Sequence, residues 1–220
     1  MTAAAAGSLH AADRTLSITD FDRIRATGTM TVIVTKSYAA SVRMSGDQHD
    51  LDTIETHVSA QTLVIGVAHF GWGSSAVARG PLTVYVSTPR LRAATLVGSG
   101  RMVIDQLGAP RVDLALVGAG EMNISEIAAE NLTLSVSGSG RLTAAGKAAQ
   151  AQLSAQGSAT LEAESLVVQD AKISAFGAAT IGATASRSAD ITAAGSGTVN
   201  VSGHPACVVH NAGAGEVICG

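Results

Sequence analysis

Residues 114–143 read LALVGAGEMNISEIAAENLTLSVSGSGRLT and contain two copies of a short glycine tag. The tags are Val117-Gly118-Ala119-Gly120 and Ser137-Gly138-Ser139-Gly140, so their first glycines, at 118 and 138, lie 20 residues apart. Apolar residues alternate with small or polar ones beside each tag, as at Leu132 and Leu134. A period of two indicates half-buried β-strands on both sides of a glycine turn.

The tag recurs along the chain at successive distances of 20, 20, 19, 20, 18 and 18 residues. Its first glycines are Gly98, Gly118, Gly138, Gly157, Gly177, Gly195 and Gly213, and its second are Gly100, Gly120, Gly140, Gly197 and Gly215, with Ala159 and Ala179 in two copies. Units this short cannot bury their apolar face alone and must stack on one another. The sequence therefore predicts an all-β fold, a parallel β-helix of about seven coils of 18–20 residues, each built as strand, glycine turn, strand, turn. The general preference for right-handed crossovers predicts a right-handed helix.

The glycine tags are expected to form a ridge of tight turns, because glycine reaches positive φ without steric cost. Ala159 and Ala179 indicate that the second tag position does not need positive φ in every coil. Helices are nearly excluded, because no segment keeps a 3.6-residue period between glycine breakers. A β-propeller is disfavoured, because its blades need about 40 residues.

We expect three segments along the chain. Residues 1–12 form a leader, which is either disordered or the remainder of a removed signal peptide. Residues 13–92 form an N-terminal β cap or first coils, with strands such as 30–35, 62–67 and 82–87. Residues 93–220 form the Gly-Ser-Gly β-helix, continuous with the cap as one domain. A cap is expected because a bare β-helix end exposes unpaired backbone.

Composition excludes several classes of protein. The 220 residues carry a net charge of −3, with 14% charged and 3% aromatic residues. This balance provides neither the basic field nor the aromatic set that nucleic-acid binding needs. No apolar run reaches the roughly 18 residues of a membrane span. We therefore expect no nucleic-acid partner and no membrane-spanning segment.

The two cysteines lie symmetrically about the last tag. Cys207 stands six residues before Gly213, and Cys219 stands six residues after it. If Gly213 marks the bend of the last coil, both lie at matching heights on its two limbs, which predicts a Cys207–Cys219 disulfide and an oxidising compartment. Two alternatives stay open: a pair of buried free thiols, and a zinc site with His204 and His210, whose spacing matches no closed zinc knuckle.

No residue pattern predicts a reactive centre, so we expect no enzyme activity, no metal and no cofactor. A β-roll calcium site needs aspartate after the glycine turn, and none stands there. The acidic residues Asp105, Asp113, Glu121 and Glu126 are spread over two coils without convergence. Trp72 is the one strong candidate for stacking on a sugar, although a loop residue folded over the capping sheet is the favoured interpretation.

An ordered set of N-terminal motifs precedes the glycine tags. The motifs are Phe21-Asp22-Arg23-Ile24, Gly28, Val32-x-Val34, Ser45-Gly46-Asp47, Leu63-x-Ile65, Val84-x-Val86 and Pro89-x-Leu91, followed by Val97-Gly98-Ser99-Gly100. Over residues 15–220 this order resembles the auto-transporter adhesin head domain, or GIN domain, a bacterial family of undefined function. The resemblance implies a β-helical, exported domain of the cell envelope, and it supplies no catalytic residues.

These observations together predict a non-enzymatic surface or envelope module that acts in adhesion or assembly through flat solenoid faces. The outward residues of the later coils are small and polar, as at Ser154, Gln156, Ser174 and Thr192. Expected partners are a second copy, a surface glycan or an envelope protein, and expected locations are the periplasm, the outer membrane surface or the extracellular space. Two alternatives remain: a self-polymerising structural subunit, and a carbohydrate-binding or carbohydrate-active β-helix protein.

Overall fold

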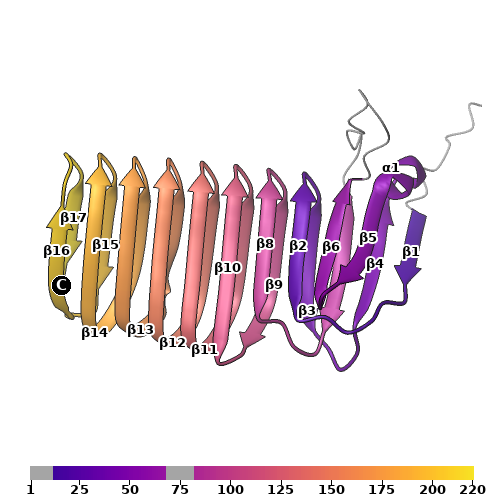
Figure 1. Ribbon diagram of the computed structural model, residues 1–220, viewed down its shortest axis with the longest axis horizontal. Helices are drawn as coiled ribbons and strands as arrows, with labels where there is room; N and C mark the ends of the chain where they lie inside the picture. Colours follow the sequence, from indigo (N-terminus) through magenta and orange to yellow (C-terminus); the bar gives the residue numbers. More distant parts are fainter. Residues whose placement is uncertain (1–11, 68–81) are drawn as a thin grey trace, which may run out of the picture.

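The computed structural model describes residues 12–67 and 82–220, of which 75% lie in strands and 3% in a helix. The chain winds into a β-solenoid of about 6 turns, one fewer than the seven tags suggest. Figure 1 shows the coils stacked side by side along the long axis, with the C-terminus at one end and α1 at the other. Among the described residues, no helix has the length and apolar character that a bilayer crossing needs.

One wall of the solenoid, here called sheet A, consists of the strands that precede the glycine turns. Its neighbours, in order, are β5 (Ile54–Ser59), β6 (Thr62–Val67), β2 (Arg23–Gly28), β8 (Ala93–Gly98), β10 (Arg111–Gly118), the second halves of β11 (Glu121–Gly138), β12 (Arg141–Gly157), β13 (Thr160–Gly177) and β14 (Thr180–Gly195), and β16 (Ala206–Asn211). All these pairs are parallel except β5 with β6.

The opposite wall, sheet B, consists of the strands that follow the turns. Its neighbours, in order, are β1 (Ala12–Leu16), β4 (Ser41–Gly46), β7 (Thr83–Thr88), β3 (Thr31–Lys36), β9 (Arg101–Gly108), the first halves of β11 to β14, β15 (Thr198–Ser202) and β17 (Glu216–Cys219). The β1–β4 and β4–β7 pairs are antiparallel, and the others are parallel.

The parallel register stacks the first glycine of each tag into a column. Gly28 pairs with Gly98, and the column continues through Gly118, Gly138, Gly157, Gly177 and Gly195. At Gly118, φ is +119°, and a Cβ atom there would lie 2.4 Å from the carbonyl oxygen of Gly98. Only glycine fits so close an approach of backbone to backbone. Gly28 belongs to this column although its surroundings, Thr27-Gly28-Thr29, do not match the tag.

The interior is a stack of aliphatic side chains. Leu114 pairs with Leu134, and the row continues through Leu153, Ile173 and Ile191, all of them buried. These inward positions alternate with outward polar ones, as the sequence predicts. Each buried residue removes apolar surface from water, and burying a side chain of this size stabilises the fold by about 1.5–3 kcal/mol.

The second corner of each coil differs from the expected turn. From β11 to β14 the strand continues through this corner, and the pairing register shifts there, as between Ile124 and Ile127. Gly146 lies in this corner with φ +128° and pairs with Ile127. An extra residue in one strand bends the ladder without ending it, so a bulge replaces the expected turn.

One short helix, α1 (Gln48–Thr53), departs from the expectation that helices are nearly absent. Its N-cap is Asp47, whose side chain accepts a hydrogen bond from the backbone N–H of His49 at 2.9 Å. Leu51 is buried between β4 and β5, which α1 connects. A capping aspartate and one buried leucine suffice for this short helix, which contacts β1 (Ala12–Leu16), β4 and β5.

Candidate ligand-binding face

The outward surface of sheet B, here called face B, pairs several of its charged groups across neighbouring coils. Arg101 donates to Glu121 at 2.5 Å, and Arg141 donates to Glu162 at 2.6 Å. Gln106 donates to Glu126 at 3.2 Å. Each of these pairs joins neighbouring coils, because parallel stacking places side chains one coil apart next to each other. The unpaired polar side chains of face B in the described chain, such as Asp105, Glu164 and Asn200, stand apart on different coils and line none of the cavities described below.

The outward surface of sheet A, here called face A, contains a groove with a volume of about 480 Å³. The groove crosses the beginnings of five adjacent strands, from β10 to the second half of β14. It is lined by Arg111, Asp113, Asn131, Leu132, Thr133, Gln150, Ala151, Gln152, Asp170, Ala171, Lys172, Ser188 and Asp190. Eight of the polar side chains have no protein partner among the described residues: Arg111, Asp113, Asn131, Thr133, Gln150, Gln152, Lys172 and Asp190.

Two rows of outward residues make this groove. The first row, Arg111, Asn131, Gln150, Asp170 and Ser188, is placed in register by strand pairing. The second row is Asp113, Thr133, Gln152, Lys172 and Asp190. Members of the first row stand seven residues before the first glycine of their tag, as 111 stands before 118 and 131 before 138. This constant offset marks the first row in the sequence, although the glycine tags alone do not indicate it.

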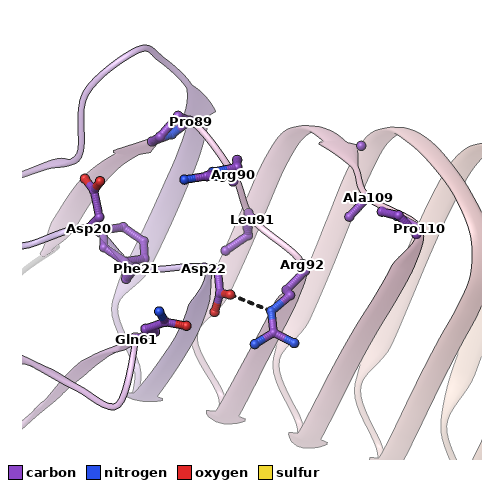
Figure 2. A pocket seen from close by; sticks show the side chains of 11 residues that line it. Asp20, Phe21, Asp22, Gln61, Pro89, Arg90, Leu91, Arg92, Ala109 and Pro110 are labelled. Atoms are coloured by element: carbon purple, nitrogen blue, oxygen red, sulfur yellow. Dashed lines mark hydrogen bonds and ion pairs between the residues drawn. The ribbon is translucent and has the colours of Figure 1, made fainter.

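A second cavity, of about 350 Å³, adjoins the groove on its N-terminal side (Figure 2). Its wall includes Pro110, the residue before Arg111 of the groove. Inside it, Arg92 Nε donates to Asp22 Oδ2 at 2.6 Å. This ion pair joins the segments that lead into β2 and β8, and Figure 2 shows it between Gln61 and the 109–110 corner. Pocket and groove thus follow one another along the same edge of face A.

Asp170 is the one acidic residue of the groove that the protein itself pairs. Arg187 Nε donates to Asp170 Oδ1 at 2.7 Å, and the Ser188 hydroxyl donates to the same oxygen at 2.7 Å. The Arg187 guanidinium, with a further contribution from Ser188, lowers the pKa of Asp170 from 3.8 to about 2. Asp170 is therefore ionised at neutral pH and cannot act there as a general acid.

We expect the carboxyl carbon of Asp170, followed by NMR, to titrate with a midpoint near pH 2. The folded pKa lies below the unfolded value, so this group stabilises the fold above about pH 4 and loses that contribution as pH falls towards 2. Arg187→Ala should return the midpoint most of the way to 3.8, because Arg187 is the larger cause of the shift. Ser188→Ala, the control, should raise it less. A wild-type midpoint near 4 contradicts the pairing.

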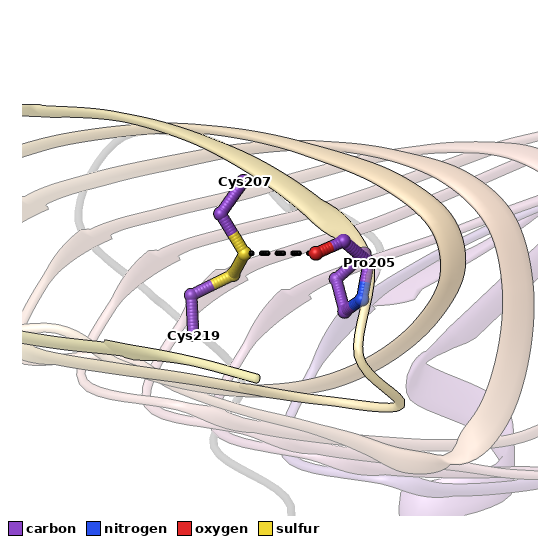
Figure 3. Close-up of a disulfide and its surroundings, with 3 residues drawn as sticks. All are labelled: Pro205, Cys207 and Cys219. Atoms are coloured by element: carbon purple, nitrogen blue, oxygen red, sulfur yellow. Dashed lines mark hydrogen bonds between the residues drawn. A yellow bond between two sulfur atoms is a disulfide. The ribbon is translucent and has the colours of Figure 1, made fainter.

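The Cys207–Cys219 disulfide is present, as the sequence predicts, and it joins β16 of sheet A to β17 of sheet B (Figure 3). The two Cα atoms lie 6.5 Å apart. Cys207 pairs in register with buried Ala189, and Cys219 pairs with buried Val201. Both cysteines therefore occupy inward rows at the end of the solenoid. The disulfide also removes the two thiolates that a zinc site with His204 and His210 would need.

The other candidate residues are not brought together. Asp105, Glu121 and Glu126 lie in strands of sheet B, whereas Asp113 lies in β10 of sheet A. Glu121 and Glu126 are occupied by Arg101 and Gln106. Trp72 lies outside the described residues. The second glycines of the tags, such as Gly120, also approach the coil below, since a Cβ there would lie 2.6 Å from the Gly100 carbonyl oxygen.

One exposed aromatic residue on face A, Phe176, was not among the candidates predicted from the sequence. Phe176 is 42% exposed and lies in β13, in the same outward row as Val117 and Gln156. The strand alternation that places Ser174 outward also places Phe176 outward, so the pattern contained this information. Phe176 stands four residues beyond Lys172, about 13 Å along the strand, and therefore outside the groove.

Comparison with known proteins identifies relatives of the same shape. Residues 20–205 match the family model described as "Putative auto-transporter adhesin, head GIN domain". A solved "putative adhesin" from Bacteroides fragilis has 20% identity and a TM-score of 0.87, over 96% of this chain and 98% of that one. A "Putative lipid binding protein" from Parabacteroides distasonis has 21% identity and a TM-score of 0.79, over 97% and 98%. A "putative adhesin" from Parabacteroides merdae has 18% identity and a TM-score of 0.72, over 97% and 98%.

The curated proteins include no match to this chain. At these identities the solved structures establish the fold alone. The family model extends from just before β2 to just after β15 and so includes the N-terminal coils, the glycine column and the grooved face. On the strength of that match, the chain belongs to the GIN-domain family, which that model describes as "Putative auto-transporter adhesin, head GIN domain".

Proposed function

We propose that this chain is a non-enzymatic adhesion module on the exported side of the bacterial cell envelope, and that it holds its ligand on face A. The observation that carries the proposal is the gathering of unpaired polar side chains into one groove. The groove of face A presents eight polar side chains that lack protein partners in the described chain, whereas several charged groups of face B are paired across coils, as in Arg101–Glu121. Unpaired, orderly polar groups are what a binding surface offers.

The spacing of carboxylates supports a non-enzymatic role. Asp113 and Asp190 lie in one row, four coils apart, which is about 19 Å at the 4.8 Å spacing of paired strands. The two carboxyl groups of a glycosidase lie about 5–9.5 Å apart. Asp170 lies between them but is ionised and paired with Arg187. The two unpaired carboxylates of the groove are therefore too far apart to act as such a pair, and Asp170 is held by Arg187.

The family and the disulfide support export. Disulfides persist in oxidising compartments and are rare in the cytosol. The Cys207–Cys219 disulfide and the adhesin family together support a location outside the cytoplasmic membrane. Within that region, the outer membrane surface is the location at which an adhesive face is useful.

The test is attachment of beads that carry the purified chain to mucin, epithelial cells and intact bacteria. Gln152→Arg places a bulky cation in the middle of the groove on face A, and we expect it to reduce attachment at least fivefold. The matched control, Asn200→Arg, makes the same addition on exposed residue 200 of β15, on face B, and should attach like the wild type. Equal loss in both variants contradicts the assignment to face A. Attachment no stronger than that of albumin-coated beads contradicts adhesion itself.

A further inference from the structure

We propose that the groove of face A binds an uncharged, hydroxyl-rich polysaccharide that runs across the strands, parallel to the solenoid axis. The inference rests on the proposed function and adds the chemical class and direction of the ligand. It follows from three properties of the groove: the hydrogen-bonding groups at its centre, its charge balance and its repeat.

The centre of the groove is made of amides. Asn131 pairs in register with Gln150, and Thr133 pairs with Gln152, so three amides and one hydroxyl lie on the second and third of the five coils. An amide offers both donors and acceptors, and so does a sugar hydroxyl. None of these four side chains is engaged by another group in the described parts of the chain. The hydroxyl groups of such a ligand can therefore donate hydrogen bonds to the amide oxygens and accept them from the amide N–H groups.

The charges of the groove balance. Among the unpaired side chains, Arg111 and Lys172 are cationic, and Asp113 and Asp190 are anionic. A polyanion running along the groove would meet one carboxylate as well as one cation towards each end, Arg111 with Asp113 and Lys172 with Asp190, so the carboxylates offset the attraction of the cations. Like charges brought together across an interface disfavour binding. The balance therefore favours an uncharged chain over an anionic polysaccharide or a nucleic acid.

The repeat of the groove fixes the direction of the ligand. Each row crosses five strands at intervals of about 4.8 Å, a span of about 19 Å. Only a chain that runs across the strands meets equivalent side chains on successive coils. The backbone groups of these strands are already used in the parallel ladders on both sides, so a peptide cannot add here as another strand.

The groove contains no aromatic residue among its lining residues, so each sugar is held by hydrogen bonds without ring stacking. Each such hydrogen bond contributes only a small net free energy, because it replaces a hydrogen bond with water. We therefore expect weak binding, on the order of 1 mM per site, or about −4 kcal/mol. Adhesion at that affinity requires many copies on one surface.

The experiment is native affinity electrophoresis of the whole chain in gels that contain dextran, galactomannan or xyloglucan, which are neutral, or alginate, which is anionic. We expect at least one neutral polymer to retard the protein, with little change when salt is raised. Gln150→Ala/Gln152→Ala should weaken retardation at least fivefold, whereas Asn200→Ala on face B should leave it unchanged. All substituted side chains are exposed, and circular dichroism verifies the fold of each variant.

Failure of every neutral polymer, retardation by alginate alone, or retardation that the double variant does not change would overturn the proposal. Bead attachment separates this failure from failure of the proposed function. If attachment depends on Gln152 but no neutral polymer binds or competes, face A is adhesive and the ligand class is wrong. If attachment does not occur at all, the adhesive function is wrong.

Discussion

Alanine at Gly118 is expected to lower the free energy of unfolding by about 2–6 kcal/mol, the sum of a backbone and a packing penalty. The backbone penalty arises because φ is +119° at Gly118, where a side chain is strained. The packing penalty arises because the new Cβ would lie 2.4 Å from the carbonyl oxygen of Gly98. That oxygen is held by a hydrogen bond from Ala119 N–H at 3.0 Å, so it cannot move away without breaking the ladder. Chemical denaturation of both proteins measures the difference.

Gly108→Ala is the matched control. Gly108 ends β9, it has no positive φ, and no atom lies within 4 Å of the position of an added Cβ. We expect a change within about 0.5 kcal/mol, as for an ordinary surface substitution. Similar decreases in the free energy of unfolding for Gly108→Ala and Gly118→Ala would contradict the close backbone packing at the glycine corner.

The corner is also where the coils differ from one another. In the coils with Gly98, Gly118 and Gly138, φ at the first glycine is 118° to 119°. In the two coils that have alanine at the second position, Ala159 and Ala179, φ at the first glycine is 91° and 86°. The Cβ of alanine at the second tag position needs room. In these coils φ at the first tag glycine is smaller by about 30°. The two tag positions are therefore coupled, and substitutions at both are expected to be non-additive.

The fold could be predicted because one physical requirement repeats in every coil. A residue such as Leu134 must face inward, and its partners one coil away meet the same requirement, so the pattern appears seven times. The second corner has no such repeat, because a bulge is set by local register and leaves no fixed residue type. The helix α1 depends on Asp47 and Leu51 in a single place, and a single occurrence is too weak to outweigh the strand pattern around it.

The candidate site was harder to predict for a different reason. Asn131 and Gln150 are outward residues, and nothing in the core restricts their type, so no motif marks them. Their significance depends on whether neighbours in space pair with them, as Glu121 on the next coil pairs with Arg101 on face B. The adjoining pocket depends on Asp22 and Arg92, which are 70 residues apart and meet only after β2 and β8 pair.

Removing the disulfide in Cys207→Ala/Cys219→Ala is expected to lower the free energy of unfolding by about 3 kcal/mol, the loop-closure value for a separation of 12 residues. The loss should be concentrated in the terminal coil. β16 and β17 have neighbours on one side only, β14 and β15, and every residue of β16 is exposed. Hydrogen exchange should therefore accelerate in β16 and β17 and remain slow in β11 and β12, which have coils on both sides.

The reason lies in where the two sulfurs stand. Cys207 continues the inward row of Ala189 on sheet A, and Cys219 continues the inward row of Val201 on sheet B. The disulfide therefore bridges the two sheets across the end of the hydrophobic interior. It supplies a covalent link between the two sheets in a coil whose strands β16 and β17 pair with β14 and β15 alone. Gly220→Ala is the control, because it also changes the terminal coil but its new Cβ meets no atom within 4 Å. Its φ of +111° strains only the last residue, so exchange in β16 should stay unchanged. Uniform acceleration through β11 and β12 would contradict a local role, and free thiols in the denatured, unreduced wild type would contradict the disulfide itself.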